Sequence, residues 1–308
     1  MDVLFFADDP DPQPWAEALR RALPHGSVHE WAPGNAPQCD YAVCWKPPAA
    51  FFAGQPRLKA ILNIGAGADA VLSDPNLPAH VPVIRLDDAG MAAQMEEYVA
   101  WCALTFLRRM HDYANLQAAQ SWERLAPCAR DTFTIGIMGM GVLGQRVAGF
   151  MRDLGFPVRG WSLSGRTIDG VKSFAGTAAL DAFLAETRLL VCLLPLTAMT
   201  RGILGRETLS KLPSGAYLVN IARGGHMVEE EILGLLDSGH LAGAALDVFP
   251  VEPLPAASAL WRHPKVVVTP HVSAMTLIDE SMTQIAAKIM RLERGAAVVG
   301  VIDRDRGY

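Results

Sequence analysis

The segment Phe133-Thr-Ile-Gly-Ile-Met138, followed directly by Gly139-Met-Gly141-Val-Leu-Gly144, decides the fold of this 308-residue chain. The first stretch is a short apolar run that ends at glycine, as expected of a buried strand. The three glycines permit a tight turn, a close backbone approach to a phosphate, and close packing of helix on strand. The segment therefore predicts a strand, a turn and a helix whose first amides would bind the pyrophosphate of a dinucleotide.

The chain after this segment continues to alternate apolar runs with helical patterns. Later runs at residues 158–161, 189–193, 216–221, 243–248 and 266–269 bring the number of expected strands to six. Strands joined through helices form parallel sheets. This part of the chain therefore predicts an α/β domain with a doubly wound parallel sheet of the Rossmann type.

The chain before the segment predicts a second, smaller α/β domain. Apolar runs at 3–7, 41–45 and 60–64, with a helical pattern at 14–23, have the same rhythm. One long amphipathic helix is expected over 91–120, and a last helix over 277–293 is expected to return to the first domain. The expected division is residues 1–97 plus 275–308 for a flavodoxin-like domain and residues 98–274 for the dinucleotide-binding domain.

Composition excludes several classes of protein. Hydrophobic residues make up 51% of the chain and charged residues 19%, with a net charge of −5 and no long run of one sign. These values are typical of a globular protein whose main partner is a small molecule, and they argue against nucleic acid or a membrane surface as that partner. Five scattered cysteines and no closely spaced histidine partners predict buried thiols and no metal site. Every apolar run is shorter than the roughly 20 residues of a membrane span, and Met1-Asp2-Val3 is not a basic signal-peptide start, so we expect a cytoplasmic location.

The loop after the second strand of the larger domain bears on the choice of dinucleotide. An NAD-binding unit usually has an acidic residue there, whereas this chain has Ser162-Leu-Ser164-Gly-Arg166. Two hydroxyls and a guanidinium can hydrogen-bond a 2′-phosphate, and no carboxylate is present to repel it. The loop favours NADP(H), with NAD(H) as the alternative. The competing interpretation is a polar loop with a solvated arginine.

Three more segments place polar residues at strand ends, where open α/β sheets bind their ligands. They are Asn220-Ile-Ala-Arg223-Gly-Gly225, Leu246-Asp247-Val-Phe-Pro-Val-Glu252-Pro253 and Thr269-Pro-His271-Val-Ser273. Each alone is compatible with a surface charge, a loop or a structural histidine. Together they provide a guanidinium for a carboxylate, a carboxylate to orient a histidine, and a histidine to donate a proton. A 2-oxo acid needs this combination.

These motifs, in this order, resemble the D-isomer-specific 2-hydroxyacid dehydrogenase family, and within it the glyoxylate/hydroxypyruvate reductase A branch. The branch resemblance also rests on Asn63-Ile-Gly65-Ala-Gly67-Ala-Asp69, on Trp161-Ser-Leu-Ser, and on the last six residues, from Asp303 to Tyr308. It covers essentially the whole chain. It implies an enzyme that reduces glyoxylate and hydroxypyruvate with NADPH, and a homodimer formed through residues 91–120 and the following loop.

The resemblance also implies roles for individual residues. Arg223 would bind the substrate carboxylate, His271 would protonate the keto oxygen, and Glu252 would hold the imidazolium. Trp45, Ala66 and Gly67 in the substrate domain would contact the substrate. Asp247 would position the nicotinamide carboxamide, or would simply close its strand. The full set of expected cofactor contacts is Gly139, Gly141, Val142, Leu143, Gly144, Ser162, Ser164, Arg166, Leu194, Pro195, Ala222 and Asp247.

Two other functions remain open at the level of sequence. A reductase for a bulkier 2-oxo acid, such as a phenyl- or branched-chain pyruvate, would use the same motifs, because pocket volume depends on side-chain rotamers. A dinucleotide-sensing regulator that binds protein partners would also keep the three polar residues. The remaining histidines, including His226, have no expected role in the reaction.

Overall fold

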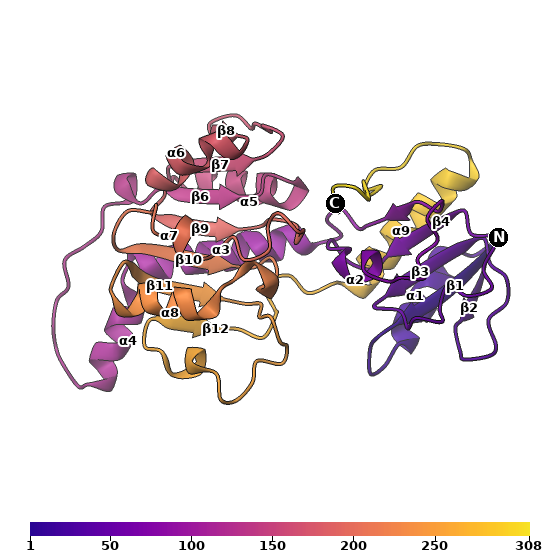
Figure 1. Cartoon of the computed structure of the whole chain (residues 1–308), viewed down its shortest axis with the longest axis horizontal. Helices are drawn as coiled ribbons and strands as arrows, with labels where there is room; N and C mark the ends of the chain where they lie inside the picture. The colour runs from indigo at the N-terminus through magenta and orange to yellow at the C-terminus, as the bar shows by residue number, and fades with distance from the viewer. The chain divides into compact units, whose positions relative to one another are not determined.

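The computed structural model describes residues 1–308 and divides into two compact units (Figure 1). The first unit joins Met1–Met91 to Thr276–Tyr308, and the second is Ala92–Met275. The assignment of these units to substrate and dinucleotide stays a prediction. None of the helices combines the length and the apolar character that crossing a membrane requires.

The first unit contains a parallel sheet in the order β2-β1-β3-β4-β5, which is the flavodoxin-like order. Its strands are β1 (Asp2–Ala7), β2 (Ser27–Glu30), β3 (Tyr41–Trp45), β4 (Ala60–Asn63) and β5 (Val83–Ile84). Its helices are α1 (Gln13–Ala22), α2 (Asp69–Leu72) and α9 (Ile278–Glu293). Although α9 comes from the far end of the chain, it packs against α1.

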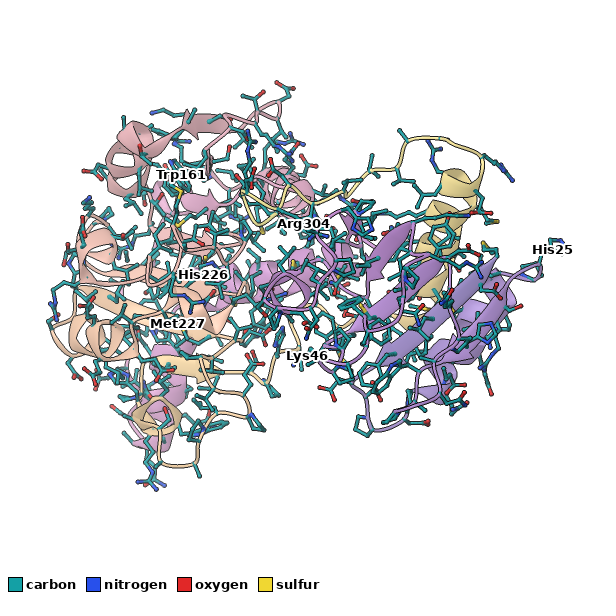
Figure 2. All side chains as sticks on the ribbon, turned by 45° about the vertical axis from the view of Figure 1, so that its right-hand side comes forward. His25, Lys46, Trp161, His226, Met227 and Arg304 are labelled. Carbon is teal, nitrogen blue, oxygen red and sulfur yellow. The ribbon has the colours of Figure 1, made fainter.

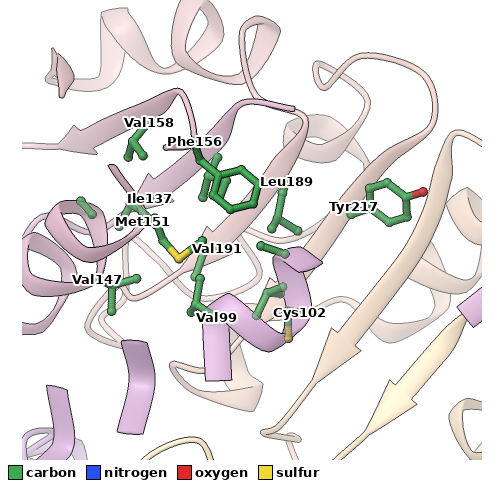
Figure 3. Packing of buried hydrophobic residues seen from close by; sticks show 14 of the residues in the cluster. Val99, Cys102, Ile137, Val147, Met151, Phe156, Val158, Leu189, Val191 and Tyr217 are labelled. Atoms are coloured by element: carbon green, nitrogen blue, oxygen red, sulfur yellow. The ribbon is translucent and has the colours of Figure 1, made fainter. Parts of the chain in front are cut away.

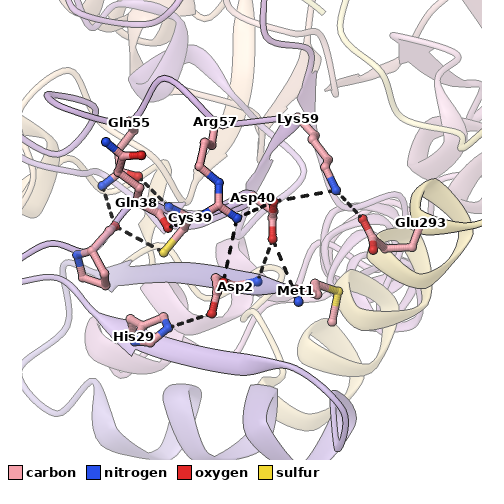
Figure 4. Close-up of polar contacts among 11 residues, drawn as sticks. Met1, Asp2, His29, Gln38, Cys39, Asp40, Gln55, Arg57, Lys59 and Glu293 are labelled. Atoms are coloured by element: carbon pink, nitrogen blue, oxygen red, sulfur yellow. Dashed lines mark hydrogen bonds and ion pairs between the residues drawn. The ribbon is translucent and has the colours of Figure 1, made fainter.

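A polar cluster joins the C-terminal end of α9 to the N-terminal edge of this sheet (Figure 4). Lys59 lies 2.9 Å from Glu293 of α9 and 3.7 Å from Asp40. Asp40 also accepts hydrogen bonds from the amide of Asp2 and the guanidinium of Arg57. These bonds hold the pKa of Asp40 below its usual value, with the Asp2 amide as the largest cause.

The second unit contains a seven-stranded parallel sheet in the order β12-β11-β10-β9-β6-β7-β8. The central reversal, between β6 and β9, is the switch point of a Rossmann sheet. The strands are β6 (Ile135–Met138), β7 (Val158–Ser162), β8 (Lys172–Ala175), β9 (Leu189–Cys192), β10 (Ala216–Asn220), β11 (Leu241–Leu246) and β12 (Val266–Val268).

Helices and short turns connect these strands. The helices are α3 (Met91–Leu107), α4 (Met110–Ala118), α5 (Val142–Asp153), α6 (Leu180–Ala185), α7 (Arg206–Leu209) and α8 (Glu229–Asp237). The 3₁₀ turns are η1 (Arg130–Thr132), η2 (Thr177–Ala179), η3 (Gly224–His226) and η4 (Ala259–Arg262). The prediction of one continuous helix over residues 91–120 is wrong, because Arg109 adopts a left-handed conformation with a φ of +57° and separates α3 from α4.

One of the two large hydrophobic cores of the second unit lies between the sheet and helices α3 and α5 (Figure 3). Val99 and Cys102 of α3 are buried in the same cluster as Ile137 of β6 and Val191 of β9. Each is at most 1% exposed. These buried residues of α3 are thus part of the core that carries the β6 turn.

The expected strands are all present, together with three that were not predicted, β2, β5 and β8. β2 and β8 lie at sheet edges and contain polar residues, so they lack the apolar run that identifies a buried strand. β5 has only two residues. The five cysteines are free thiols and four of them are buried, as expected, whereas Cys128 is partly exposed. Burial raises the pKa of Cys39 to about 11.

Candidate active site

Gly139, Gly141 and Gly144 form the turn from β6 into α5, and each has a separate reason to be glycine. Gly139 has a φ of +114°, and a Cβ there would lie 2.6 Å from the carbonyl oxygen of Leu193. A Cβ on Gly144 would lie 1.9 Å from the carbonyl oxygen of Gly139, so α5 packs closely on the turn. No heavy atom lies within 4 Å of the ideal Cβ of Gly141, so the backbone is open to a ligand there.

The N-terminus of α5 has no side-chain cap. Its first hydrogen bond runs from the amide of Gln145 to the carbonyl of Gly141, so the amides of Val142, Leu143 and Gly144 have no acceptor within the helix. Val142 is exposed and Leu143 is half-buried. Free amides at the positive end of a helix bind phosphate groups, so this turn fits the pyrophosphate of a dinucleotide.

The loop after β7 forms a compact turn. The hydroxyl of Ser162 accepts a hydrogen bond of 3.2 Å from the amide of Arg166, and Gly165 has a φ of +70°. The side chain of Ser162 therefore closes the turn, while Ser164 and Arg166 are exposed. A hydroxyl and a guanidinium in solvent at this strand end fit a 2′-phosphate.

The side chain of Asn220, at the end of β10, shapes the loop that carries Arg223. Its amide nitrogen donates to the carbonyl of Arg223 over 3.1 Å, and its oxygen accepts from the amide of Ala222 over 3.2 Å. Ala222 is buried and Arg223 is half-buried. A Cβ on Gly224 would lie 1.8 Å from the carbonyl carbon of Phe249, so this loop touches the backbone of the loop after β11.

His271 and Glu252 form a hydrogen-bonded pair. Nδ1 of His271 lies 2.9 Å from Oε2 of Glu252, and the other carboxylate oxygen accepts from the amide of Phe249 over 2.9 Å. Because a carboxylate can only accept, Nδ1 carries the hydrogen and Nε2 is left for a substrate. The two side chains are 44% and 37% exposed, so a small molecule can reach the ring.

Asp247 supports the turn that carries His271. Its carboxylate is 0% exposed and accepts from the hydroxyl of Thr269 (2.6 Å) and from the amides of Val272 (2.8 Å) and Ser273 (2.9 Å). The amide of His271 donates to the carbonyl of Asp247, and His271 has a φ of +57°. A side chain in this strained region persists only where its surroundings hold it. The contact of Asp247 with a nicotinamide stays a prediction.

Tyr98 of α3 adds a further hydrogen bond to this network. Its hydroxyl lies 2.7 Å from the hydroxyl of Thr269, which itself donates to Asp247, so Tyr98 is the donor of the first bond. Burial raises the pKa of Tyr98, so the phenol stays protonated and can donate throughout the neutral range. Helix α3 is thereby connected to the turn of His271.

Within the first unit, Trp45 and the glycine loop after β4 lie together. A Cβ on Gly65 would lie 2.8 Å from the ring of Trp45, so glycine is what allows the ring to lie against the loop. The amide nitrogen of Asn63 donates to the carbonyls of Gly65 and Gly67 and holds the loop in a tight turn. Ala66 and Gly67 are half-buried, and their amides donate no hydrogen bond to the backbone. Two such amides fit a carboxylate oxygen.

Comparison with known proteins shows which family this chain belongs to. The family model for the NAD-binding domain of D-isomer-specific 2-hydroxyacid dehydrogenases matches residues 100–273. The glyoxylate/hydroxypyruvate reductase A proteins of Salmonella paratyphi B and Salmonella newport are each 46% identical to this chain over the full length of both proteins. The chain belongs to the D-isomer-specific 2-hydroxyacid dehydrogenase family.

Solved structures of this dehydrogenase family have the same fold as the chain. A family member from Xanthobacter autotrophicus Py2, in complex with NADPH and MES, is 38% identical with a TM-score of 0.95. The NADPH-dependent glyoxylate/hydroxypyruvate reductase of Sinorhizobium meliloti, in complex with NADP and sulfate, is 39% identical with a TM-score of 0.92. Both matches cover 100% of this chain and 99% of the other.

Several residues that shape the dehydrogenase site were not found from the sequence. Asn220 and Thr269 belong to motifs that were recognised, but their side chains had no expected role. Tyr98 gave no signal, because it lies 171 residues from Thr269 in the chain. His226 contacts the carbonyl of Arg223, and its position three residues after Arg223 was the one signal in the sequence for this contact.

Proposed function

We propose that this chain is an NADPH-dependent reductase of small 2-oxo acids, which converts glyoxylate to glycolate and hydroxypyruvate to D-glycerate. The observation that carries the proposal is the His271–Glu252 pair, exposed on the unit that also holds the open glycine turn of a dinucleotide site. The names of the curated relatives and the NADP complexes of the structural relatives support the same substrates and cofactor.

In this proposal Arg223 binds the substrate and His271 donates the proton. Arg223 binds the carboxylate with its planar guanidinium and polarises the keto oxygen. His271 gives the proton of Nε2 to that oxygen, while the negative charge of Glu252 stabilises the imidazolium that carries it. NADPH, when bound, supplies the hydride for the carbonyl carbon. One hydride and one proton convert the 2-oxo acid to the 2-hydroxy acid.

Other residues hold the two ligands. The glycine turn with the first amides of α5 would bind the pyrophosphate, and Ser164 with Arg166 would bind the 2′-phosphate. We assign the amides of Ala66 and Gly67 to a carboxylate oxygen of the substrate. Trp45, whose indole ring lies against the glycine loop, would limit the size of the substrate side chain.

Steady-state rates on a panel of glyoxylate, hydroxypyruvate, phenylpyruvate and a branched-chain 2-oxo acid, each with NADPH and NADH, test the proposal. We expect the largest kcat/KM for glyoxylate or hydroxypyruvate with NADPH. A larger value for the bulky acids would reassign the enzyme to those substrates. NADPH binding without turnover of any acid would instead favour a dinucleotide-sensing regulator.

Replacing Arg166 with alanine should reduce the preference for NADPH over NADH. A hydrogen bond to a charged group contributes about 1.5–3 kcal/mol, so one arginine accounts for about 10- to 150-fold in selectivity. The measurement is the ratio of kcat/KM for the two cofactors in wild type and Arg166→Ala. Arg262→Ala, which removes another exposed arginine on the η4 turn, serves as the control. An unchanged ratio in Arg166→Ala would remove this residue from the cofactor site.

We further propose that the protein is a homodimer paired through α3, α4 and the loop after α4. Trp122 in that loop is 97% exposed, and Trp101, Leu104 and Met110 on the two helices are 45%, 41% and 53% exposed. Four large apolar side chains exposed within one continuous stretch of the chain favour an interaction surface there. Sedimentation equilibrium should give twice the 33.2 kDa of the chain, and a mass of 33.2 kDa would contradict the proposal.

A further inference from the structure

His226 is a buried histidine that the proposed reaction does not use. It ends η3, directly after the loop of Arg223, and is 0% exposed (Figure 2). Its Nδ1 lies 3.0 Å from the carbonyl oxygen of Arg223, and its Nε2 lies 3.3 Å from the carbonyl oxygen of Pro195. The two ring nitrogens therefore face two different loops, one after β10 and one after β9.

The backbones of these two loops are also hydrogen-bonded to each other. Gly202 donates to the carbonyl of Gly225 over 3.0 Å, and Leu204 donates to the carbonyl of His226 over 2.8 Å. Val228 donates back to the carbonyl of Leu204 over 3.3 Å. The imidazole thus adds side-chain contacts to backbone hydrogen bonds that already join the two loops.

We propose that His226 is a positioning residue that couples the cofactor loop at Leu194-Pro195 to the substrate loop at Arg223. This inference rests on the proposed function, which places the substrate carboxylate against the second loop, and on the expected contact of Leu194 and Pro195 with the dinucleotide. Carbonyl oxygens only accept hydrogen bonds, so the ring acts on both loops through its N–H groups. A neutral ring donates to one loop at a time, and an imidazolium donates to both.

Each carbonyl has a second partner that remains when His226 is replaced. Asn220 donates to the carbonyl of Arg223 over 3.1 Å, and the hydroxyl of Thr200 donates to the carbonyl of Pro195 over 2.7 Å. Loss of the imidazole therefore leaves neither carbonyl without a donor. The expected consequence is a shift of the loops rather than loss of the fold.

Two amide variants separate the two halves of this coupling. In His226→Asn the side-chain nitrogen takes the place of Nδ1, so the bond to Arg223 stays and the bond to Pro195 is lost. In His226→Gln the side-chain nitrogen takes the place of Nε2, so the bond to Pro195 stays and the bond to Arg223 is lost. His226→Phe keeps a ring of similar size and loses both bonds.

The readouts are the NADPH dissociation constant from fluorescence titration and KM for glyoxylate. One hydrogen bond corresponds to about a three- to tenfold change. We expect a weaker NADPH affinity in His226→Asn, a higher KM in His226→Gln and both in His226→Phe. His240→Phe is the control, because that ring contacts one carbonyl, of Leu209, and neither of the two loops. Its binding and kinetics should equal those of wild type.

Hydrogen exchange of the ligand-free protein separates a failure of this inference from a failure of the proposed function. In His226→Phe, amides at residues 196–205 and 221–228 should exchange faster than in wild type, whatever the substrate is. Unchanged exchange, NADPH affinity and KM in all three variants would overturn the coupling role. Faster exchange with weaker NADPH affinity would support it, even if the wild-type protein reduced no 2-oxo acid.

Discussion

Replacing His271 with alanine should lower turnover of glyoxylate reduction by about 10²–10⁴-fold, the range typical of a lost general acid. The alanine variant has no group that can protonate the keto oxygen. NADPH affinity should stay within about twofold of wild type, because the glycine turn and the β7 loop are separate from His271. The measurement is kcat by NADPH absorbance, together with a fluorescence titration of NADPH. Turnover at the wild-type rate would refute the proposed mechanism.

Two further variants separate proton donation from backbone strain. His271 has a φ of +57°, which asparagine tolerates better than alanine does, so His271→Asn should lose turnover to a similar extent with less strain in the turn. Glu252→Gln keeps the shape of the side chain and removes the charge 2.9 Å from Nδ1. Nδ1 then loses its charged partner, so kcat for glyoxylate reduction should fall while NADPH affinity stays at the wild-type level. A wild-type kcat in Glu252→Gln would show that Glu252 does not act through its charge.

Arg223→Ala should lower kcat/KM for glyoxylate by about 10- to 150-fold, which corresponds to the loss of about 1.5–3 kcal/mol from one charged hydrogen bond. We expect kcat to fall and KM to rise, because the guanidinium is proposed to polarise the keto oxygen and to bind the carboxylate. Arg223→Lys should recover only part of this loss, since an ammonium keeps the charge but cannot form two parallel bonds to a carboxylate.

Chemical rescue provides the control for Arg223. Free guanidinium should restore activity to Arg223→Ala more than to His271→Ala, because only the first variant lacks that group. NADPH affinity should be unchanged in both arginine variants. A wild-type KM and kcat in Arg223→Ala would show that the substrate carboxylate binds elsewhere.

Much of the fold could be predicted from local sequence patterns. The strand before Gly139 and the strand before Arg223 are buried apolar runs, and such runs are recognisable wherever they lie in the chain. Edge strands were missed, because β2 and β8 face solvent and do not need an apolar sequence. The break at Arg109 was missed, because the pattern of apolar residues continues from α3 into α4 on either side of one left-handed residue.

Short motifs at the ends of strands were enough to identify the residues that carry the proposed chemistry. The glycine turn and the loop of Arg223 depend on local backbone geometry, which the neighbouring residues set. Glu252 and His271 each lie in a short motif after a strand, although their contact spans 19 residues. Tertiary structure alone decided what holds these groups in place. Tyr98 reaches Thr269 across 171 residues, and His226 joins Arg223 to Pro195, which lies 31 residues before it. Such contacts exist only after parallel strands have brought distant loops to the same edge of a sheet.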